Sequence, residues 1–516
     1  MKVTFAKGAI PMDTLARWAG GELILHRIGT VPMAGRACTD SREADSAPDA
    51  GTLFCAIRGE RVDGHSYMAA VAAHPGLYGC GCFLCEQIPD ALTWADTPFA
   101  AIWVEDTVAA LSRMAAGYRT QELPGLRAVG VTGSVGKTTV KTCCAAVLEG
   151  GFSTYHREGN FNSVIGLPLS VMEISPTHEM AVLEMGMSAR GEIQAMSGAV
   201  RPHIGIITNV GTSHLEHLGS RENIARAKLE ILTGIQPGGY LLVQGDEPLL
   251  QDPALLAETG RSDVHILRLS LTDPTADVYA RPAEAPENGG MTFDLTLPGA
   301  HWPGMTIPAP GTHMVQAAAF GAAVGYLCGL DQGAVQAGLT RYRPEALRQT
   351  VRLVGGVYLL EDCYNAAPES MAAALEVLDM TAGVGKPGRS EKSPDARQDA
   401  PAPTGRRIAV LGDMKELGRD TVALHRGVGR LCAGRRLDGL VTVGALAAEI
   451  AQGACQGGME PARVLTLGAD GEPVDPEAAA ARLAGLVRPG DTVLFKASRA
   501  MGLERISQAL SSLLDR

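Results

Sequence analysis

The sequence lacks the features that mark membrane-spanning, secreted or nucleic-acid-binding proteins. None of its apolar runs approaches the roughly 20 residues that cross a bilayer as a helix. The N-terminus, Met-Lys-Val-Thr-Phe-Ala-Lys, carries charge where a signal peptide has its apolar segment. Basic residues are outnumbered, because 45 Lys and Arg stand against 56 Asp and Glu, for a formal net charge of −11. We therefore expect a cytoplasmic protein with no membrane span and no nucleic-acid partner.

The sequence also lacks the repeated cysteine pairs of a structural zinc site. Cys80, Cys82 and Cys85 lie close together and His74 is nearby, but no second pair follows. A structural zinc ion usually takes its four ligands from two such pairs. We interpret these residues as buried strand cysteines, and the odd total of 11 Cys as reduced thiols rather than a disulfide framework.

The pattern of apolar runs predicts an α/β protein with several domains. A chain of 516 residues suggests about three domains, and we place them at 1–122, 123–345 and 346–516. Residues 383–405, rich in Gly, Pro, Ser and charge, are predicted to be a flexible loop without a catalytic role. Apolar runs separated by helical patterns predict buried parallel strands in the second and third segments. These runs cover 126–131, 180–183, 203–207 and 240–243, and then 357–360, 408–411, 440–443, 464–467 and 492–495.

A glycine-rich stretch at 130–139 follows the first of these runs and precedes a predicted helix at 137–148. Strand, glycine-rich turn and helix together predict a phosphate-binding loop, because loop N–H groups and the helix start attract anions. Lys137 would reach the terminal phosphates of a nucleotide, and Thr138 would offer a hydroxyl to Mg²⁺. Five residues rather than the usual four separate Gly130 from Gly136, so an ordinary glycine turn is the alternative.

Polar residues follow the next strands of the second segment. Glu184 ends the run at 180–183, and His214 follows the run at 203–207. Since ligands gather beyond the carboxyl ends of parallel strands, both could converge on a metal ion held by Thr138. The alternatives are a salt bridge for Glu184, a helix cap for His214, and an exposed lysine paired with Glu230 for Lys228, on the predicted helix at 225–231.

Weaker signals lie in the other segments. In the first segment, Asp40, Ser41 and Arg42 flank a predicted strand at 53–57, where Arg42 could clamp a phosphate; a solvated turn is the alternative. Asn160 and Asn162 lie in a polar loop before a predicted helix. In the third segment, polar junctions follow three of the predicted strands, at 361–371, 411–418 and 496–502.

These motifs, in this order, resemble those of the Mur ligase family, and in particular its MurF-type branch. Thr-Gly-Ser-Val-Gly-Lys-Thr-Thr at 132–139 is similar to the family's ATP loop, including its spacing. The last segment contributes Leu-Gly-Asp-Met-Lys-Glu-Leu-Gly at 411–418 and Lys-Ala-Ser-Arg-Ala-Met-Gly-Leu-Glu at 496–504, and the stretch from Asp362 to Met371. The Asp-Asn-Pro-Arg tetrapeptide of a related ligase is absent. The match runs through all three segments.

The resemblance implies an ATP-dependent peptide ligase that joins D-alanyl-D-alanine to UDP-N-acetylmuramoyl-tripeptide through an acyl phosphate, in peptidoglycan precursor synthesis. It implies a small α/β N-terminal domain for the UDP substrate, a central ATP-binding domain and a C-terminal Rossmann-like domain for the dipeptide. It further implies small-molecule substrates and a monomer.

The resemblance also implies roles for single residues. Thr138 and Glu184 would bind one Mg²⁺, and His214 and Lys228 a second, with Lys228 carbamylated; Lys137 would contact ATP. The remaining assignments are as follows: ATP binding by Gly133, Ser134, Val135, Gly136, Thr139, Arg348, Asp362 and Asn365; UDP-muramoyl-peptide binding by Ser41, Arg42, Asp63, His65, Asn160 and Asn162; and dipeptide binding by Lys415, Ser498 and Arg499.

One stretch departs from the family pattern. Where the family usually has Gly-x-His-Asn-x-x-Asn-Ala, this chain has Met314 and Ala317 in place of the two asparagines. The nucleotide contact of that region is therefore in question, and Gln316 is a candidate substitute. The alternatives are a neighbouring ligase that adds a single amino acid, a folylpolyglutamate-type ligase, or a noncatalytic nucleotide-dependent binding protein of the same fold.

Overall fold

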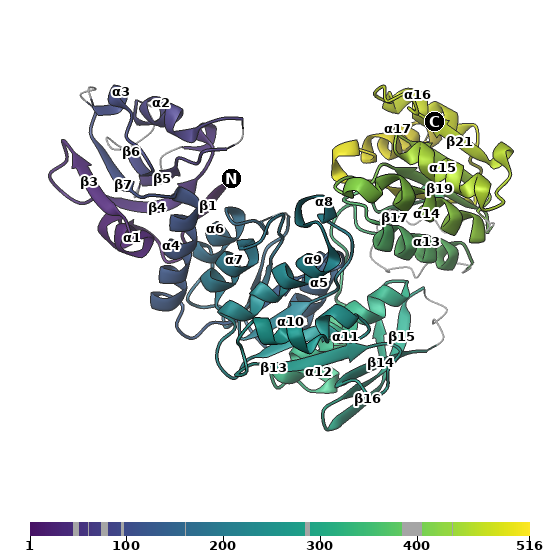
Figure 1. The fold of residues 1–516 in the computed structure, drawn as a ribbon, viewed down its shortest axis with the longest axis horizontal. Coiled ribbons are helices and arrows are strands. Elements are labelled where there is room, and N and C mark those ends of the chain that lie inside the picture. The colour runs from purple at the N-terminus through teal and green to yellow at the C-terminus, as the bar shows by residue number, and fades with distance from the viewer. Residues whose placement is uncertain are drawn as a thin grey trace.

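The strands of the protein form three separate sheets, which define a first, a central and a third lobe along the chain (Figure 1). The structure is a computed structural model that describes residues 1–44, 51–59, 61–73, 81–93, 97–159, 161–283, 289–383, 405–435 and 437–515. Each sheet lies inside one of the three predicted segments. Among the described helices, none has the length and apolar character needed to cross a membrane.

The first sheet has a parallel middle and antiparallel edges. Its order is β1-β4-β5-β6-β7-β3, with β2 paired to β4. Side chains alternate between two buried clusters, one on each face, and Trp18 and Tyr118 meet edge to face in one of them. The elements are β1 Lys2–Thr4, β2 Ile10–Pro11, α1 Met12–Ala19, β3 Glu22–His26, β4 Met33–Cys38, β5 Gly51–Cys55, α2 Met68–Ala72, β6 Gly81–Cys85, α3 Asp90–Thr93, β7 Phe99–Trp103 and α4 Thr107–Gln121.

The interpretation of the cysteine cluster as buried strand residues is confirmed for Cys82 and Cys85. Both lie on β6 and are almost fully buried as free thiols. Burial raises the pKa of the Cys85 thiol to about 12, so this thiol is protonated at neutral pH. Cys80 and His74 lie outside the described residues.

The central sheet places the predicted phosphate loop between two neighbouring strand ends. Its order is β16-β15-β14-β13-β12-β11-β8-β10-β9, parallel from β9 to β14 and antiparallel beyond. The four predicted strands are confirmed as β8, β10, β11 and β12, whereas β9 and β13–β16 were not predicted. The strands are β8 Arg127–Thr132, β9 Thr154–His156, β10 Met180–Glu184, β11 Ile204–Ile207, β12 Tyr240–Gln244, β13 His265–Ser270, β14 Val278–Pro282, β15 Met291–Leu297 and β16 Ala300–Ile307.

Helices cover both faces of the central sheet. The predicted helix at 137–148 is confirmed as α5, which packs with α11 and α12 over one hydrophobic cluster. On the other face, α4, α6, α7 and α9 join a cluster that continues into the first lobe. The helices are α5 Lys137–Leu148, α6 Gly166–Met172, α7 Glu192–Val200, α8 Leu215–Leu218, α9 Arg221–Leu229, α10 Pro253–Glu258, α11 Thr312–Leu327 and α12 Gln332–Thr340.

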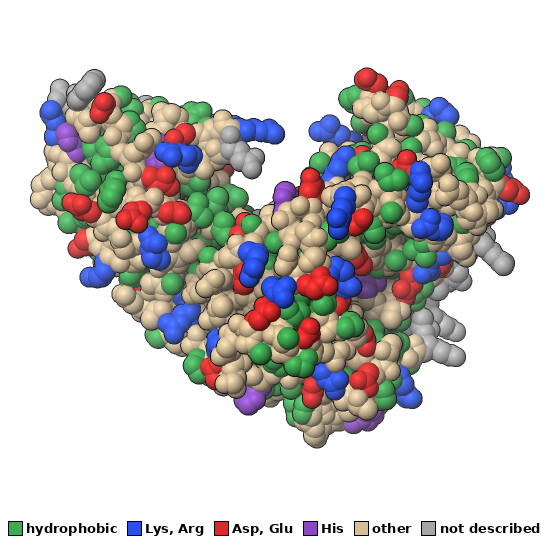
Figure 2. Space-filling view, in the orientation of Figure 1, with side chains coloured by type: hydrophobic (Ala, Val, Ile, Leu, Met, Phe, Trp, Pro, Cys, Tyr) green, Lys and Arg blue, Asp and Glu red, His purple; other side chains and the backbone are tan. Residues whose placement is uncertain are grey.

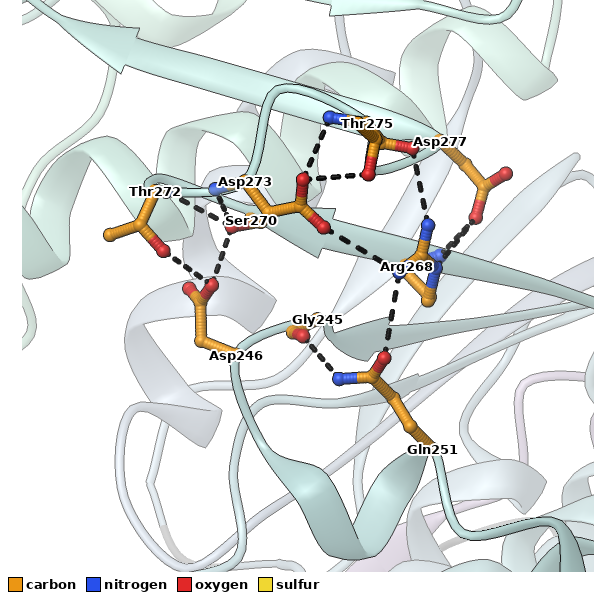
Figure 3. A network of polar contacts seen from close by, with 9 residues as sticks. All are labelled: Gly245, Asp246, Gln251, Arg268, Ser270, Thr272, Asp273, Thr275 and Asp277. Atoms are coloured by element: carbon orange, nitrogen blue, oxygen red, sulfur yellow. Dashed lines mark hydrogen bonds and ion pairs between the residues drawn. The ribbon is translucent and has the colours of Figure 1, made fainter.

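Arg268 of β13 secures the turn between β13 and β14 (Figure 3). Its guanidinium donates to the carbonyl of Thr275 over 3.1 Å, and its backbone N–H donates to Oδ2 of Asp277 over 2.8 Å. Beside it, Oδ1 of Asp246 accepts from the hydroxyl of Ser270. Arg268 also pairs with Asp273 and Asp277, so this network joins the end of β13 to the start of β14 and stabilises that end of the sheet.

The third sheet is parallel except for the edge strand β17. Its order is β17-β18-β22-β19-β20-β21. All five predicted strands are confirmed within one residue at each end, and β17 was not predicted. The loop predicted at 383–405 lies outside the described residues apart from its two ends. The elements are β17 Thr350–Val354, β18 Val357–Glu361, α13 Pro368–Gly383, β19 Arg407–Gly412, α14 Thr421–Gly434, β20 Gly439–Val443, α15 Ala447–Gln456, β21 Val464–Leu467, α16 Pro476–Ala484, β22 Thr492–Lys496 and α17 Glu504–Leu514.

Candidate active site

The glycine-rich loop joins β8 to α5 and takes a shape that only glycine allows at its start. Gly133 has a φ of +150°, and a Cβ there would lie 1.8 Å from Oγ1 of Thr208. Gly136, with a φ of +80°, ends the loop at the N-cap of α5. The predicted strand, turn and helix are therefore confirmed, and the loop lies at a helix N-terminus suited to an anion.

Two residues that follow β11 hold this loop from the side. Thr208 donates its hydroxyl to the carbonyl of Val135 over 2.6 Å. The side-chain oxygen of Asn209 accepts from the N–H groups of Ser134 and Val135, over 2.9 and 3.0 Å. Sequence reasoning gave neither residue a role. The sequence did contain a signal for a role of these two residues beside the loop. Both directly follow a predicted parallel strand, and that strand, β11, lies next to β8 in the sheet.

Thr138 and Glu184 form the oxygen pair that the sequence predicted as a metal site. Oγ1 of Thr138 donates to Oε2 of Glu184 over 2.7 Å, and Asn162 donates its amide to Oε1 over 2.8 Å. Burial opposes the charge on Glu184, but Lys137, the hydrogen bond from Thr138 and more distant cations outweigh it and lower the pKa of the carboxyl. A buried, ionised carboxylate beside a hydroxyl suits Mg²⁺.

Two lysines predicted for this site differ in burial, since Lys137 is half-buried and Lys228 fully buried. Nζ of Lys137 donates to the carbonyl of Gly133 over 2.9 Å. Lys228, on α9, is 1% exposed, and no described side chain forms a hydrogen bond or ion pair with its amine. Burial and the charge of Lys137 lower the pKa of Lys228 well below its usual value. The alternative of an exposed lysine is therefore wrong, and Glu230 instead accepts from the N–H of Gly191.

His214 points toward the third lobe. It occupies the N-cap position of α8 with a φ of +62°, but its side chain makes no capping hydrogen bond. Its Nδ1 lies 2.7 Å from Oε2 of Glu416, a residue that also has a positive φ, of +63°. His214 therefore occupies the helix-cap position that the alternative predicted, but its imidazole does not cap the helix and instead contacts the third lobe.

A cavity of about 930 Å³ lies between the central and third lobes and brings most of the predicted residues together. It is lined on one side by the phosphate loop and Glu184, and on the other by the ends of β18, β19 and β22. Gly133 and Lys228 are not among the lining residues. The predicted residues that line it are Ser134, Val135, Gly136, Lys137, Thr138, Thr139, Asn162, Glu184, His214, Arg348, Asp362, Asn365, Lys415, Ser498 and Arg499.

The side formed by the third lobe is a polar network built on Lys496, which sequence reasoning left without a role. Its buried amine lies 2.7 Å from Oδ2 of Asp362 and donates to the carbonyl of Asn365 over 3.0 Å. Arg348 stacks its guanidinium over the ring of Tyr364, 4.0 Å from the centroid. The basic residue at the end of β22 could have been identified from its position after an apolar run.

The dipeptide residues predicted at the other strand ends are partly engaged with their neighbours. The amine of Lys415 lies 2.7 Å from Oδ2 of Asp413, and its backbone N–H donates to Oγ of Ser498. Arg499 pairs with Glu504 over 2.6 Å. Lys415, Ser498 and Arg499 line the same cavity as the phosphate loop.

The stretch that departs from the family pattern lies at the start of α11. Met314 and Ala317 are buried, at 1% and 3% exposure, and Ala317 also borders the cavity. Gln316 lines the cavity and donates its amide to the carbonyl of Thr208 over 3.3 Å. His313 and Gln349 also line the cavity and contact each other through their side chains.

The residues predicted for the UDP portion lie in the first lobe, apart from this cavity. Arg42 is exposed, and its guanidinium forms two hydrogen bonds with Asp40, which holds the pKa of that carboxyl well below its usual range. Ser41 begins the short 3₁₀ helix that follows. His65 is buried, with Nδ1 2.6 Å from Asp63 and Nε2 accepting from the N–H of Glu86. Asn160 lies outside the described residues.

The surface is hollowed between the first and third lobes, above the central lobe (Figure 2). Lys and Arg side chains stand on both rims of this hollow. The cavity between the central and third lobes and the hollow that faces the first lobe are the features of a multi-lobed α/β protein with room for a ligand between its lobes.

Comparison with known proteins gives the class its name. The family model described as "Mur ligase middle domain" matches residues 131–325, and "Mur ligase, glutamate ligase domain" matches residues 386–499. The chain belongs to the Mur ligase family of ATP-dependent ligases.

Within this family, the chain is similar to ligases that share one name. The chain is 35% identical over 475 residues to the UDP-N-acetylmuramoyl-tripeptide–D-alanyl-D-alanine ligase of Bacillus subtilis (strain 168), covering 92% of each protein. A crystal structure of MurF from Acinetobacter baumannii is 27% identical, with a TM-score of 0.79 and coverage of 98% of this chain and 99% of that one. MurF ligase from Thermotoga maritima in complex with ADP is 25% identical, with a TM-score of 0.73, over 93% and 97%.

Proposed function

We propose that the protein joins D-alanyl-D-alanine to UDP-N-acetylmuramoyl-tripeptide with ATP, forming ADP and phosphate. The observation that carries this proposal is the 930 Å³ cavity, because it gives the phosphate loop and the Arg348, Asp362 and Lys415 side of the third lobe one common space. The names of the relatives specify the two substrates. The ADP complex of a related ligase supports nucleotide binding.

The hydroxyl of Thr138 and the carboxylate of Glu184, which lie 2.7 Å apart, fit one Mg²⁺ ion. We assign a second ion to His214 and Lys228; in this structure Nδ1 of His214 lies 2.7 Å from Oε2 of Glu416. A lysine is no metal ligand while it carries a proton, but the lowered pKa of Lys228 favours the neutral amine. A neutral amine adds CO₂ and releases a proton, and the resulting carbamate has oxygens that can bind a metal. When bound, the ions would offset negative charge on the transferred phosphoryl group.

The residues of the chain would then act in order on the two substrates. Lys137 reaches the terminal phosphates, and the substrate carboxylate attacks the γ-phosphorus, which gives an acyl phosphate and ADP. The amine of the dipeptide attacks the acyl carbonyl, phosphate leaves, and a proton is lost from nitrogen. Lys415, Ser498 and Arg499 would hold the dipeptide. Arg348, Asp362 and Asn365 would close over ATP and keep out water, which would hydrolyse the acyl phosphate.

We assign the UDP portion to the first lobe, residues 1–122. Arg42 is oriented by Asp40 and keeps its outer edge in solvent, where a diphosphate could bind it. Ser41 would support it with its hydroxyl. Asp63 and His65 brace each other next to this lobe's strand ends. Asn160 and Asn162 would bind the muramoyl peptide. The cytoplasmic location and the monomeric state stay predictions.

Phosphate release tests the proposal. We expect release from ATP with UDP-N-acetylmuramoyl-tripeptide to depend on added D-alanyl-D-alanine. Lys137→Ala should lower kcat/KM about 100-fold or more, because a cation at the transferred phosphoryl group is lost. Lys7→Ala, an exposed lysine of the first lobe, is the matched control. Release that needs a single amino acid instead of the dipeptide would indicate a neighbouring ligase. ADP binding without any release would indicate a binding protein.

A further inference from the structure

The third lobe is joined to the rest of the molecule mainly through polar contacts. One hydrophobic cluster runs without a break from the first lobe into the central lobe. The third lobe instead has two clusters of its own. Within the described chain, Met380 is the third-lobe side chain that packs against a central cluster. Specific hydrogen bonds must therefore set how the third lobe lies on the phosphate loop.

Helix α13 lies on the side of the third lobe that faces the central lobe (Figure 1). Its one face is buried in the third lobe's own core through Met371, Ala374, Leu375 and Leu378. Its other face carries Glu369, Ala373, Glu376 and Met380, spaced by three or four residues as one stripe of a helix. Both carboxylates of this stripe bind a threonine of the central lobe in the same way.

Glu376 caps a helix of the other lobe. Its Oε1 accepts from the backbone N–H of Thr312 over 2.9 Å and from the Thr312 hydroxyl over 2.5 Å. Thr312 is the first residue of the 16-residue helix α11, whose N-cap, Gly311, has no side chain to do this. A carboxylate at the start of a long helix satisfies an orphan N–H and meets the positive end of the helix dipole. α11 also supplies Gln316 to the cavity.

Glu369 binds Thr212, which follows a residue in contact with the phosphate loop. Its Oε1 accepts from the backbone N–H of Thr212 over 3.1 Å and from the Thr212 hydroxyl over 3.3 Å. The preceding residue, Gly211, donates its N–H to Oγ of Ser134 in the loop. A Cβ on Gly211 would lie 2.9 Å from Oε1 of Glu369 and 3.1 Å from Cβ of Ser134, so glycine is what permits both approaches.

We propose that Glu369 and Glu376 form a two-point latch, positioning residues that hold the third lobe in register with the phosphate loop and with α11. The latch keeps Arg348 and Asp362 opposite Lys137 before any substrate binds. The consequence for catalysis rests on the proposed function, whereas the effect on lobe arrangement and on nucleotide affinity does not.

The test uses the full chain and the double variant Glu369→Ala/Glu376→Ala. Small-angle X-ray scattering without ligand reports the lobe arrangement, and titration with ADP reports the nucleotide affinity. Glu369→Gln/Glu376→Gln is the conservative pair, because an amide oxygen still accepts both hydrogen bonds. Glu477→Ala, an exposed glutamate on α16, controls for the loss of charge in the same lobe. Thr312→Val removes one donor from the other side of the interface.

We expect the alanine pair to enlarge the radius of gyration and to weaken ADP binding about tenfold. In part of the free protein the third lobe will have moved away from the phosphate loop, and it must return before ADP binds. KM for ATP should rise more than kcat falls, since saturating substrates restore the arrangement. The glutamine pair and Glu477→Ala should stay close to the parent protein. Thr312→Val should weaken ADP binding less in the Glu376→Ala background than it does in the parent protein.

An unchanged radius of gyration and unchanged ADP affinity in the alanine pair would refute the latch. So would a glutamine pair as impaired as the alanine pair, or full additivity of Thr312→Val with Glu376→Ala. If the alanine pair does not fold, the glutamine pair and Thr312→Val decide through the same two measurements. If the parent protein shows no dipeptide-dependent phosphate release, the proposed function fails while the scattering and ADP results still decide on the latch.

Discussion

Asn209→Ala should weaken nucleotide binding without touching a residue that contacts phosphate. The Asn209 side-chain oxygen is held within 3.0 Å of two loop N–H groups, those of Ser134 and Val135. In the variant, the N–H of Val135 loses its acceptor. The N–H of Ser134 keeps a weaker bond of 3.3 Å to the backbone carbonyl of residue 209. The loop should then sample shapes that do not fit a phosphate.

The size of the effect follows from these contacts. A hydrogen bond contributes about 1 kcal/mol net, and one full and one partial loss give about 1–2 kcal/mol. Because the equilibrium between binding-competent and other loop shapes shifts by that free energy, the Kd for ADP should rise by a factor of up to about 5 to 30. Thr208→Val, which removes the 2.6 Å bond to Val135, should act on the same equilibrium and combine less than additively with Asn209→Ala.

Isothermal titration with ADP measures this directly, and a thermal scan of the same samples controls for unfolding. An ADP affinity within twofold of the parent protein for Asn209→Ala would show that the loop holds its shape without this side chain. It would equally contradict the reasoning if the two variants were fully additive, since the loop would then be fixed by independent contacts.

Three further outcomes are expected. Arg119→Met should lower the free energy of unfolding by about 3 kcal/mol in urea titration, because three buried backbone carbonyls each lose one hydrogen-bond donor; a loss below 1 kcal/mol would contradict this. Lys496→Met should cost about 3–5 kcal/mol by leaving Asp362 unpaired, and adding Asp362→Asn should recover part of it; no recovery would contradict the pairing. Burial lowers the pKa of His425, whose Nε2 accepts from the N–H of Met414, so the unfolded chain binds more protons below pH 6.5 and stability is lost as pH falls. His425→Gln should flatten this slope, of at most about 1.4 kcal/mol per pH unit, between pH 5.5 and 7.0, and an unchanged slope would contradict it.

The parts of the fold that could be predicted from sequence are those with a local signal. Continuous apolar runs predicted the buried parallel strands, because such strands are covered on both faces. The antiparallel strands β15 and β16 were missed for the same reason. In β15, Met291–Leu297, buried residues alternate with more exposed ones, so the period of two was the signal and a search for continuous runs passes over it.

The residues of the candidate site also differ in whether a local sequence signal predicts them. Lys137, Thr138 and Glu184 could be predicted because each follows a strand directly or belongs to a compact motif. Lys228 was placed by resemblance alone, since nothing in its helical stretch shows that the amine is buried. The contact between His214 and Glu416 joins two lobes, and a local window contains no information about such a pair.

The position of Arg348 is likewise a property of the assembled lobes. Leu347 and Gln349 on either side of it have φ values of +61° and +53°, a conformation that costs a non-glycine residue about 1–2 kcal/mol. Contacts on both sides hold this strained linker. Gln349 binds His313 of α11, the carbonyl of Leu347 accepts from the N–H of Tyr364, and Glu345 pairs with Lys141 of α5 over 2.7 Å. The linker is therefore fixed to the helix that follows the phosphate loop and to the third lobe at once. We therefore expect a loosening of one lobe on the other to relax the strain and withdraw the guanidinium from the cavity, so the arrangement that the proposed α13 latch would maintain is also the one that places Arg348 opposite Lys137.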